Sequence, residues 1–391
     1  MKVIGLMSGT SADGIGVALV DIHGKTQISL LAFKTYPFST ELKKMILLAS
    51  SHEKLAVDEI CRLNFLLGEE FSKATLRLCK EAKVSLKDIA LIGSHGQTIK
   101  HLPPKSTKPI QFGSTLQIGE PSLISERTGI TTIADFRPRD MAAGGHGAPL
   151  APYLHYHLFH SLGYGVAVQN IGGISNLTFI PKNGKLNQVI AFDTGPGNML
   201  IDAIVFELTH KKSSYDDEGR WAARGKVNKR LLGRLMQHPF LKRKPPKSTG
   251  REEFGIFFAH QLMRENKNMK KEDLIATITA FTAHSIAESY GRFIMPKFSL
   301  KEIIVGGGGV KNKTLFSMVQ RLLPSIQLKR FEDFSLNSDA IEAMAFALLA
   351  HETMKNVPSN IPNVTGARHA VLLGKIIPGN NFKKLLLSFK S

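Results

Sequence analysis

Short runs of apolar residues separated by small polar ones open the chain and predict three strands. The runs cover 3–7, 15–22 and 29–36, and the small polar segment 8–14 lies between the first two. A tight glycine-rich turn of this kind joins antiparallel neighbours, so we predict a meander. Apolar residues then recur every three or four positions over 41–50 and 58–82, which predicts two helices, and 90–93 is typical of a buried strand.

The same order of elements returns in the middle of the chain. Strands are predicted at 166–170, 176–180 and 188–192, with a small-residue turn between the first two and an apolar helix after 195–198. Further helices are predicted over 222–237, 252–266, 273–293, 314–323 and 338–354, with another buried strand at 303–305. A pattern repeated in this way predicts an α/β protein with two similar lobes.

Composition narrows the class of protein without fixing its partner. A chain of 391 residues is expected to form two domains. The formal net charge of +19 permits a nucleic-acid partner or an anionic substrate and establishes neither. The two cysteines, Cys61 and Cys79, argue against a disulfide scaffold and a zinc module. We find no signal-peptide core and no bilayer-length apolar stretch, and therefore expect a cytoplasmic protein.

Two glycine-rich turns are candidates for binding phosphate. In the segment 8–14, small residues would let backbone N–H groups approach an anion, and Asp13 could hold a hydrated cation. A plain hairpin turn uses the same residue types. The segment 170–176 occupies the matching place in the second round, and two such turns at equivalent positions favour phosphate binding.

Other segments leave structural and chemical interpretations open. Asp193 is either a helix cap or a general base at a strand end. Four glycines at 306–309 form a plain loop or a surface for a nucleotide base. The basic segment 242–251 favours a solvated or phosphate-facing loop over a nucleic-acid patch, because it lacks interleaved aromatic residues.

Together, several segments resemble the anhydro-N-acetylmuramic acid kinases, from residue 3 to about residue 378. The resemblance rests on Met7–Gly14, Gly93–Thr98, Asp135–Arg137, Ala142–Leu150, Asn170–Gly173, Phe192–Asn198, Pro246–Glu252, Gly306–Gly309 and Asp339–Ala343. It implies an actin-like ATPase fold, in which two ribonuclease-H-like lobes form a central cleft for ATP and substrate. We expect the first lobe at 1–135, joined by 365–391, and the second at 136–364.

The resemblance also implies a reaction that belongs to peptidoglycan recycling. Water opens the 1,6-anhydro bridge of anhydro-N-acetylmuramic acid, and the freed O6 takes the γ-phosphoryl group of ATP. The products are N-acetylmuramic acid 6-phosphate and ADP. Mg²⁺ would accompany ATP, Asp13 would hold the metal, through water if not directly, and a homodimer without nucleic-acid or membrane partners is expected.

Individual residues take roles from the matching motifs. Asp193 matches the catalytic base, and the sugar side is expected to contain His95, Arg137, Arg139 and Glu342. The residues expected to bind ATP and its phosphates are Ser8, Gly9, Thr10, Ser11, Ala12, Asp13, Gly14, Ile15, Asn170, Gly172, Gly173, Gly195, Gly197, Gly307 and Gly308.

Two positions depart from the family pattern. Gly16 stands where an Asp is usual, which would weaken metal binding if that Asp serves the metal, and His146 replaces a usual Gln. The alternatives are a kinase for another amino sugar on the same fold and a non-catalytic basic binding protein for nucleic acid or peptidoglycan fragments.

Overall fold

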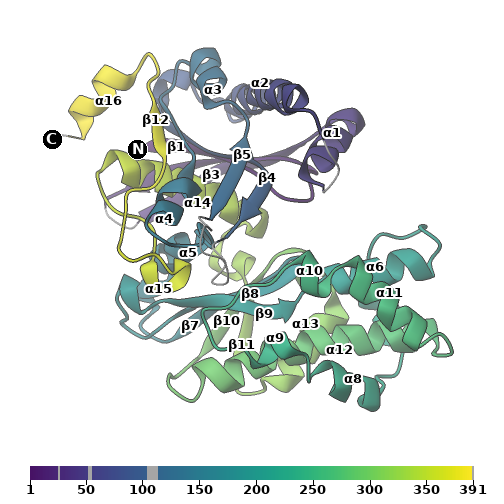
Figure 1. Ribbon diagram of the computed structural model, residues 1–391. Helices are drawn as coiled ribbons and strands as arrows, with labels where there is room; N and C mark the ends of the chain where they lie inside the picture. Colours follow the sequence, from purple (N-terminus) through teal and green to yellow (C-terminus); the bar gives the residue numbers. More distant parts are fainter. Residues whose placement is uncertain (25–26, 52–54, 104–112, 390–391) are drawn as a thin grey trace. The chain divides into compact units, whose positions relative to one another are not determined.

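The computed structural model describes residues 1–24, 27–51, 55–103 and 113–389. The chain separates into two compact units (Figure 1). The first unit combines Met1–Leu158 with Asp339–Ser391, and the second is the continuous segment Phe159–Ser338. Each unit is built around one sheet.

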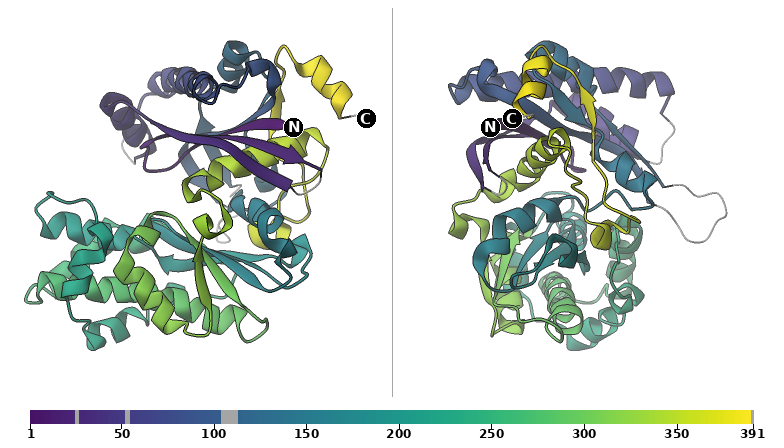
Figure 2. Two further views of the ribbon diagram at one scale, coloured as in Figure 1. Left: turned by 180° about the vertical axis from the view of Figure 1, so that it is seen from behind. Right: turned by 90° about the vertical axis from the view of Figure 1, so that its left-hand side faces the viewer.

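The sheet of the first unit begins with the predicted meander. Its strands are β1 (Lys2–Ser8), β2 (Gly14–His23), β3 (Gln27–Pro37), β4 (Ile89–Leu102), β5 (Ser114–Ile118), β6 (Thr132–Ala134) and β12 (Lys375–Ile377). The spatial order is β12-β6-β4-β1-β2-β3, with β5 paired to β4. β1, β2 and β3 are antiparallel neighbours, visible as the purple strands in Figure 2, whereas β4 runs parallel to β1 and β6.

The second sheet repeats this topology with five strands. They are β7 (Val166–Ile171), β8 (Ile174–Ile180), β9 (Ile190–Pro196), β10 (Glu302–Gly306) and β11 (Gln327–Arg330), in the order β11-β10-β7-β8-β9. β7, β8 and β9 form an antiparallel meander, and β10 lies parallel to β7 and β11. An antiparallel meander extended by two parallel strands is the ribonuclease-H-like arrangement, so the predicted α/β class with two such lobes is confirmed.

Helices cover both faces of the first sheet. They are α1 (Thr40–Ser50), α2 (Val57–Glu81), α3 (Pro121–Thr128), α4 (Phe136–Ala142), α14 (Ile341–Met354), α15 (Pro362–Thr365) and α16 (Phe382–Ser388). Side chains alternate along a strand, and Ile4 and Leu6 pack into the core that α1 and α2 complete. Gly5 lies on the opposite face, directly under the backbone of Ala343 in α14.

Most helices of the second unit follow β9. They are α6 (Met199–Leu208), α7 (Arg220–Arg224), α8 (Lys229–Leu235), α9 (Pro239–Lys242), α10 (Arg251–Phe254), α11 (Ile256–Glu265), α12 (Lys271–Ser289) and α13 (Lys313–Leu322), and α5 (Ala151–Phe159) leads into the unit. Short 3₁₀ helices and one π-helical turn, η5, complete the chain: Leu86–Asp88 (η1), His160–Leu162 (η2), Leu186–Gln188 (η3), Asp217–Gly219 (η4), Tyr290–Ile294 (η5), Gly308–Lys311 (η6), Phe331–Phe334 (η7) and Ser338–Ala340 (η8).

Several predicted elements differ in extent. The helix expected over 222–237 is divided into α7 and α8, because the backbone is extended at Gly225 and Asn228 caps a new helix by accepting from the Leu231 N–H. The helix expected over 252–266 is interrupted at Gly255. The strand expected to end at 93 continues through β4 to Leu102.

The compact units also begin and end elsewhere than the expected lobes. The segment 339–364 was expected in the second lobe, yet α14 packs against β1, β4 and β2 of the first unit. Residues 136–158 belong to the first unit as well. The hydrophobic pattern of a buried helix does not reveal which of two similar sheets it covers, so the sequence could not settle these boundaries.

Candidate active site

The turn between β1 and β2 combines exposed hydroxyl groups with a buried anchor. Thr10, Ser11 and Asp13 are exposed, whereas Gly9 is half-buried and Ala12, Gly14 and Ile15 are mostly or wholly buried. Ser8 is 1% exposed, and its Oγ lies 3.0 Å from the carbonyl oxygen of Gly14. The Ser8 hydroxyl therefore closes the turn from within, while Thr10 presents an exposed hydroxyl to an anion.

Gln97, on the neighbouring strand β4, holds this turn in a way that the sequence did not reveal. Its Oε1 lies 2.6 Å from Ser8 Oγ, and its Nε2 donates to the carbonyl oxygen of Gly9 at 3.2 Å. The motif 93–98 drew attention to His95, but Gln97 is 1% exposed and on a neighbouring strand. It holds the start of the turn from the side of β4.

Asp13 fits a weakly held, hydrated cation better than a closed metal site. Its side chain is 66% exposed and forms an ion pair with Lys43. Partial burial works to raise the pKa of Asp13, but hydrogen bonds to Lys43 and Ser11 lower it overall. No group of three or more His, Cys, Asp or Glu side chains suited to a metal occurs in the described ranges. One carboxylate plus substrate phosphates is nevertheless an ordinary way to hold Mg²⁺.

The turn between β7 and β8 is packed closely against the end of β9. The N–H groups of Gly197 and Asn198 donate to the carbonyl oxygens of Gly173 and Gly172, at 3.0 and 2.8 Å. The backbone of Gly197 lies so near Gly172 that a side chain at 197 would overlap it. The structure thus brings Gly172, Gly173 and Gly197 together, three residues that the sequence predicted to bind ATP and its phosphates.

The glycine run at 306–309 meets the same turn. Gly307 has φ +80°, and a Cβ there would overlap Asn170 Oδ1 and the carbonyl oxygen of Ile171. Gly308, in contrast, is exposed, with only Asn198 Nδ2 at 3.5 Å from a Cβ built there. Packing therefore explains Gly307, whereas Gly308 leaves an open backbone surface. Gly195 lies instead against Ser285 of α12.

Asp193 lies in β9 and does not cap the helix that follows, so of the two interpretations the helix cap is excluded. The N-cap of α6 is Asn198. The N–H of Asp193 donates to the carbonyl oxygen of Lys247 at 3.0 Å, and Oδ2 accepts from the Thr249 N–H at 2.9 Å. Burial raises the pKa of Asp193 to about 7, even though the Thr249 hydrogen bond and the Lys247 charge oppose the rise. A carboxylate poised near neutral pH is suited to take and release a proton.

His95 and Arg137 form a fixed pair in the first unit. His95 Nδ1 lies 2.9 Å from the carbonyl oxygen of Gly96, and Nε2 accepts from Arg137 Nε at 3.0 Å. Burial, followed by the charge of Arg137, lowers the pKa of His95 well below its ordinary value, so the ring is neutral. Arg137 Nη1 donates to the carbonyl oxygen of Gly147 at 2.8 Å.

Glu342 and Arg139 are related to this pair in different ways. Glu342 is exposed at the start of α14. Burial lowers the pKa of Arg137 to about 10, and the charge of Glu342 partly offsets this lowering. Arg139 is exposed on α4, two residues from Arg137, and helix positions two apart do not face one another. The structure therefore brings His95, Arg137 and Glu342 into one electrostatic group, and leaves Arg139 outside it.

A cavity of about 450 Å³ opens beside His95 within the first unit. Its polar lining includes Asn64, His95, Gln117, Glu120, Asp135 and Lys375. Ser94 also lines it, and within the part of the chain that the structure describes the buried Ser94 Oγ has no hydrogen-bond partner. A cavity lined by amide groups and by charged groups of both signs suits a ligand rich in hydroxyl or amide groups.

Asp140 is a further buried carboxylate to which the sequence analysis gave no role. Its Oδ2 accepts from the Gly147 N–H at 2.8 Å, and Oδ1 accepts from Asn360 and Thr365, both at 2.7 Å. The unusual His146 donates its backbone N–H to the carbonyl oxygen of Thr365 at 2.7 Å. These contacts fix the segment whose Gly147 carbonyl holds Arg137, and they use only the backbone of His146.

The family model and two of the most similar relatives carry one name. A family model for anhydro-N-acetylmuramic acid kinase matches residues 1–379. A protein of that name from Caldanaerobacter subterraneus is 51% identical over 96% of both chains, and one from Bacillus cereus is 48% identical over 96% of this chain and 99% of its own. Among solved structures, component A of the Acidaminococcus fermentans (R)-2-hydroxyglutaryl-CoA dehydratase has a TM-score of 0.46 and 12% identity, over 90% of this chain and 98% of its own.

Among the described residues, none of the helices has the length and apolar character that crossing a membrane requires.

Proposed function

Because the chain belongs to the anhydro-N-acetylmuramic acid kinase family, we propose that it converts 1,6-anhydro-N-acetylmuramic acid to N-acetylmuramic acid 6-phosphate with ATP. One observation carries this proposal: Asp193 is a half-buried carboxylate with a pKa raised to about 7 and one oxygen held by a backbone N–H. Hydrolytic opening of a 1,6-anhydro bridge needs such a group, because water must lose a proton as it attacks C1.

The proposed reaction couples two bond changes on one sugar. Asp193 takes a proton from water while the water oxygen bonds to C1 and the bond between C1 and O6 breaks. O6 then bonds to the γ-phosphorus, and ADP leaves. Asp193 finally returns its proton to solvent. Phosphoryl transfer itself asks the protein mainly for positioning and for donors to the phosphate oxygens.

We assign the phosphate contacts to the two turns. In the first unit, the exposed Thr10 hydroxyl and the backbone of Gly9 are the donors available in the turn that Gln97 holds. Ser11 would join them once it releases Asp13. In the second unit, the Asn170–Gly173 turn offers backbone donors, and the open surface at Gly308 suits a nucleotide base. Mg²⁺ would neutralise phosphate charge, with Asp13 as its ligand through water once Lys43 is displaced.

We assign sugar recognition to the first unit. Arg137 is held by His95 and Gly147, so its guanidinium has a fixed direction, which suits the lactyl carboxylate. Glu342 is the exposed carboxylate of the same group and an acceptor for sugar hydroxyls. Four points remain predictions: sugar binding by Arg139, assembly as a homodimer, a cytoplasmic location and a place in peptidoglycan recycling.

The test is product analysis in water labelled with ¹⁸O. The protein is mixed with Mg-ATP and the anhydro sugar, and the products are analysed by mass. We expect one ¹⁸O atom at C1 of a sugar 6-phosphate, with one ADP for each sugar. A phosphorylated sugar without label would favour a simple kinase for another amino sugar. Absence of turnover, combined with salt-dependent binding of nucleic acid, would favour the non-catalytic alternative.

A further inference from the structure

Lys247 is buried inside an aromatic enclosure in the second unit. The residue is 8% exposed, although it belongs to the basic segment 242–251 that the sequence predicted to be solvated or phosphate-facing. Its Nζ lies 4.5 Å from the ring centroid of Phe240, 5.3 Å from that of Phe293 and 5.8 Å from that of Phe192. The exposed-loop interpretation is therefore wrong for this one lysine.

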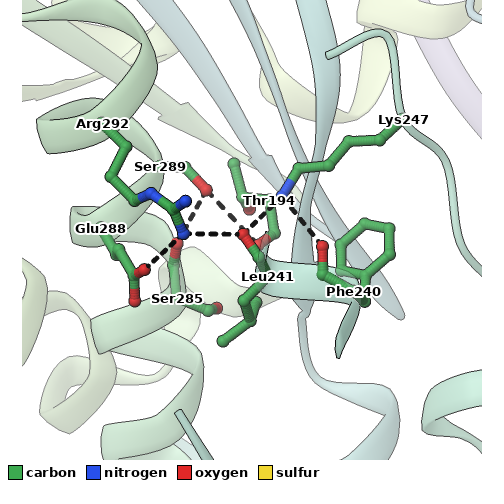
Figure 3. A network of polar contacts seen from close by, with 8 residues as sticks. All are labelled: Thr194, Phe240, Leu241, Lys247, Ser285, Glu288, Ser289 and Arg292. Atoms are coloured by element: carbon green, nitrogen blue, oxygen red, sulfur yellow. Dashed lines mark hydrogen bonds and ion pairs between the residues drawn. The ribbon is translucent and has the colours of Figure 1, made fainter. Parts of the chain in front are cut away.

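The ammonium group also meets two backbone carbonyls. Nζ donates to the carbonyl oxygens of Phe240 at 3.4 Å and Leu241 at 3.5 Å (Figure 3). The Leu241 carbonyl accepts from Arg292 Nη1 as well, at 3.2 Å, and Arg292 pairs with Glu288. Two cations thus converge on the carbonyl of one residue, at the end of α9.

The backbone of the same segment holds Asp193 at two points. The Lys247 carbonyl accepts from the Asp193 N–H at 3.0 Å, and the Thr249 N–H donates to Oδ2 at 2.9 Å. Asp193 Oδ1 accepts no hydrogen bond from the described residues. The segment therefore fixes the carboxylate through one oxygen and leaves the other for a reacting proton.

A lysine is an unexpected choice for this place if its only task is packing. Burying an ammonium group among rings is unfavourable compared with burying an apolar side chain of the same length. Methionine would fill the enclosure and avoid that desolvation. The charge therefore points to an electrostatic or anchoring task next to Asp193.

We infer that Lys247 is a positioning residue for Asp193: its ammonium group, held by Phe192, Phe240 and Phe293, anchors the 247–249 backbone against β9 and brings a positive charge to the ring of Phe192, the residue next to Asp193. This inference rests on the proposed function only in naming the reaction that Asp193 would serve. The positioning itself is a property of the second unit.

Burial and neighbouring charges shift the pKa values of both Asp193 and Lys247. Burial raises the pKa of Asp193, the charge of Lys247 lowers it, and that of Glu252 raises it. Burial lowers the pKa of Lys247 to about 8, where Arg292 and Arg243 act in the same direction and Glu288 and Asp193 oppose it. Near neutral pH the ammonium group is thus charged, and its charge keeps the pKa of Asp193 lower than burial alone would make it.

The experiment compares Lys247→Met, which keeps the side-chain length and removes the charge, with Lys247→Arg, which keeps the charge. Lys244→Met is the matched control, because Lys244 is exposed in the same segment. For Lys247→Met we expect kcat to fall about 30-fold with KM for ATP and sugar within about twofold. The acidic limb of kcat should move up by about one pH unit, because the stabilising charge is gone. Lys247→Arg should restore the limb, and Lys244→Met should change neither quantity.

A second readout does not depend on turnover. ¹³C-carboxyl NMR titration of Asp193, assigned by its absence in Asp193→Asn, measures the pKa directly in each variant. An upward shift in Lys247→Met supports the inference even if the wild type fails to convert the anhydro sugar, which would refute only the proposed function. An unchanged Asp193 pKa in folded Lys247→Met, or an equal loss of kcat in Lys247→Arg without recovery of the limb, would overturn it.

Discussion

Five strands of each sheet share one order, and the two sets differ clearly at the third strand of the meander. In the first sheet the row across the strands is Met7, Gly16 and Thr35, and in the second it is Asn170, Asn176 and Asp193. Met7 and Asn170 both stand two residues before the first glycine of their turn. Thr35 is exposed on β3, whereas Asp193 is half-buried in β9.

The covering of the third strand explains this difference. After β3 the chain proceeds to α1 and α2, which leave much of β3 exposed. After β9 it adds α6 to α12, and the segment 247–249 bonds directly to Asp193. One topology thus yields a solvent-exposed edge in one unit and a buried carboxylate with a shifted pKa in the other. The segment inserted between α9 and α10, rather than the strand order, sets the surroundings of this carboxylate.

The largest effect is expected from removing the buried carboxylate. Asp193→Asn keeps the shape and an acceptor for Thr249, but it has no carboxylate to take a proton. We expect kcat to fall about a thousandfold, a size typical of a positioned general base, and ATP affinity to stay within about threefold. Steady-state kinetics and calorimetry measure both. Thr35→Val, at the equivalent row of the first sheet, is the control, and near wild-type turnover of Asp193→Asn would refute the assigned base.

The glycine run gives the next largest effect. Gly307→Ala would place a Cβ against Asn170 and Ile171 at φ +80°, so we expect the free energy of unfolding to fall by about 3 kcal/mol. Gly308→Ala meets open space, and its stability should stay within about 0.5 kcal/mol of the wild type. Denaturant unfolding measures both variants. Equal destabilisation of the two would contradict the packing described for Gly307.

The raised pKa of Asp193 predicts a pH-dependent stability. In the window from about pH 4 to pH 7, the folded protein keeps a proton that the unfolded chain releases, so the free energy of unfolding falls as pH rises through this window. Asn does not titrate, and at pH 8 Asp193→Asn should be more stable by about 2 kcal/mol after allowance for solvent screening. Parallel stability curves for the two proteins between pH 4 and pH 8 would exclude this ionisation.

The smallest effect concerns the first turn. Gln97→Leu removes the contacts with Ser8 and Gly9 and keeps the size of the side chain. We expect KM for ATP to rise about tenfold, the equivalent of one or two hydrogen bonds, with kcat at saturation nearly unchanged. Thr98→Val, one residue further along β4, should leave KM within about twofold. An unaltered KM in a folded Gln97→Leu protein would show that the turn is held without it.

Periodicity predicted the elements well because each is a local property. Both meanders, α1 and α2 appear close to their expected bounds, since alternation and three-to-four spacing depend only on neighbours along the chain. The motifs also directed attention to Asp193 and to His95 and Arg137. The helix predicted over 222–237 was wrong in extent, because three-to-four spacing does not register the extended backbone at Gly225 or the new helix that Asn228 caps.

The contacts that the side chains of Gln97 and Lys247 make could not be predicted from the neighbouring residues in the sequence. Gln97 owes its role to pairing between β4 and β1, and a strand pattern does not specify the partner strand. Lys247 lies among charged and proline residues typical of an exposed loop, yet Phe192 and Phe293 enclose it from other elements. Burial of a charged side chain is set by tertiary structure, which composition alone does not encode.

The discontinuous first unit has a consequence for the order in which the protein is made. The second unit is one uninterrupted segment, and all five strands of its sheet precede Asp339. The first unit begins earlier but lacks α14 and β12 until the final stretch of the chain has left the ribosome. Until then Gly5 and Gly93 lack α14, the helix that packs on them in the complete fold. The half of the molecule that is synthesised first is therefore the half that is completed last.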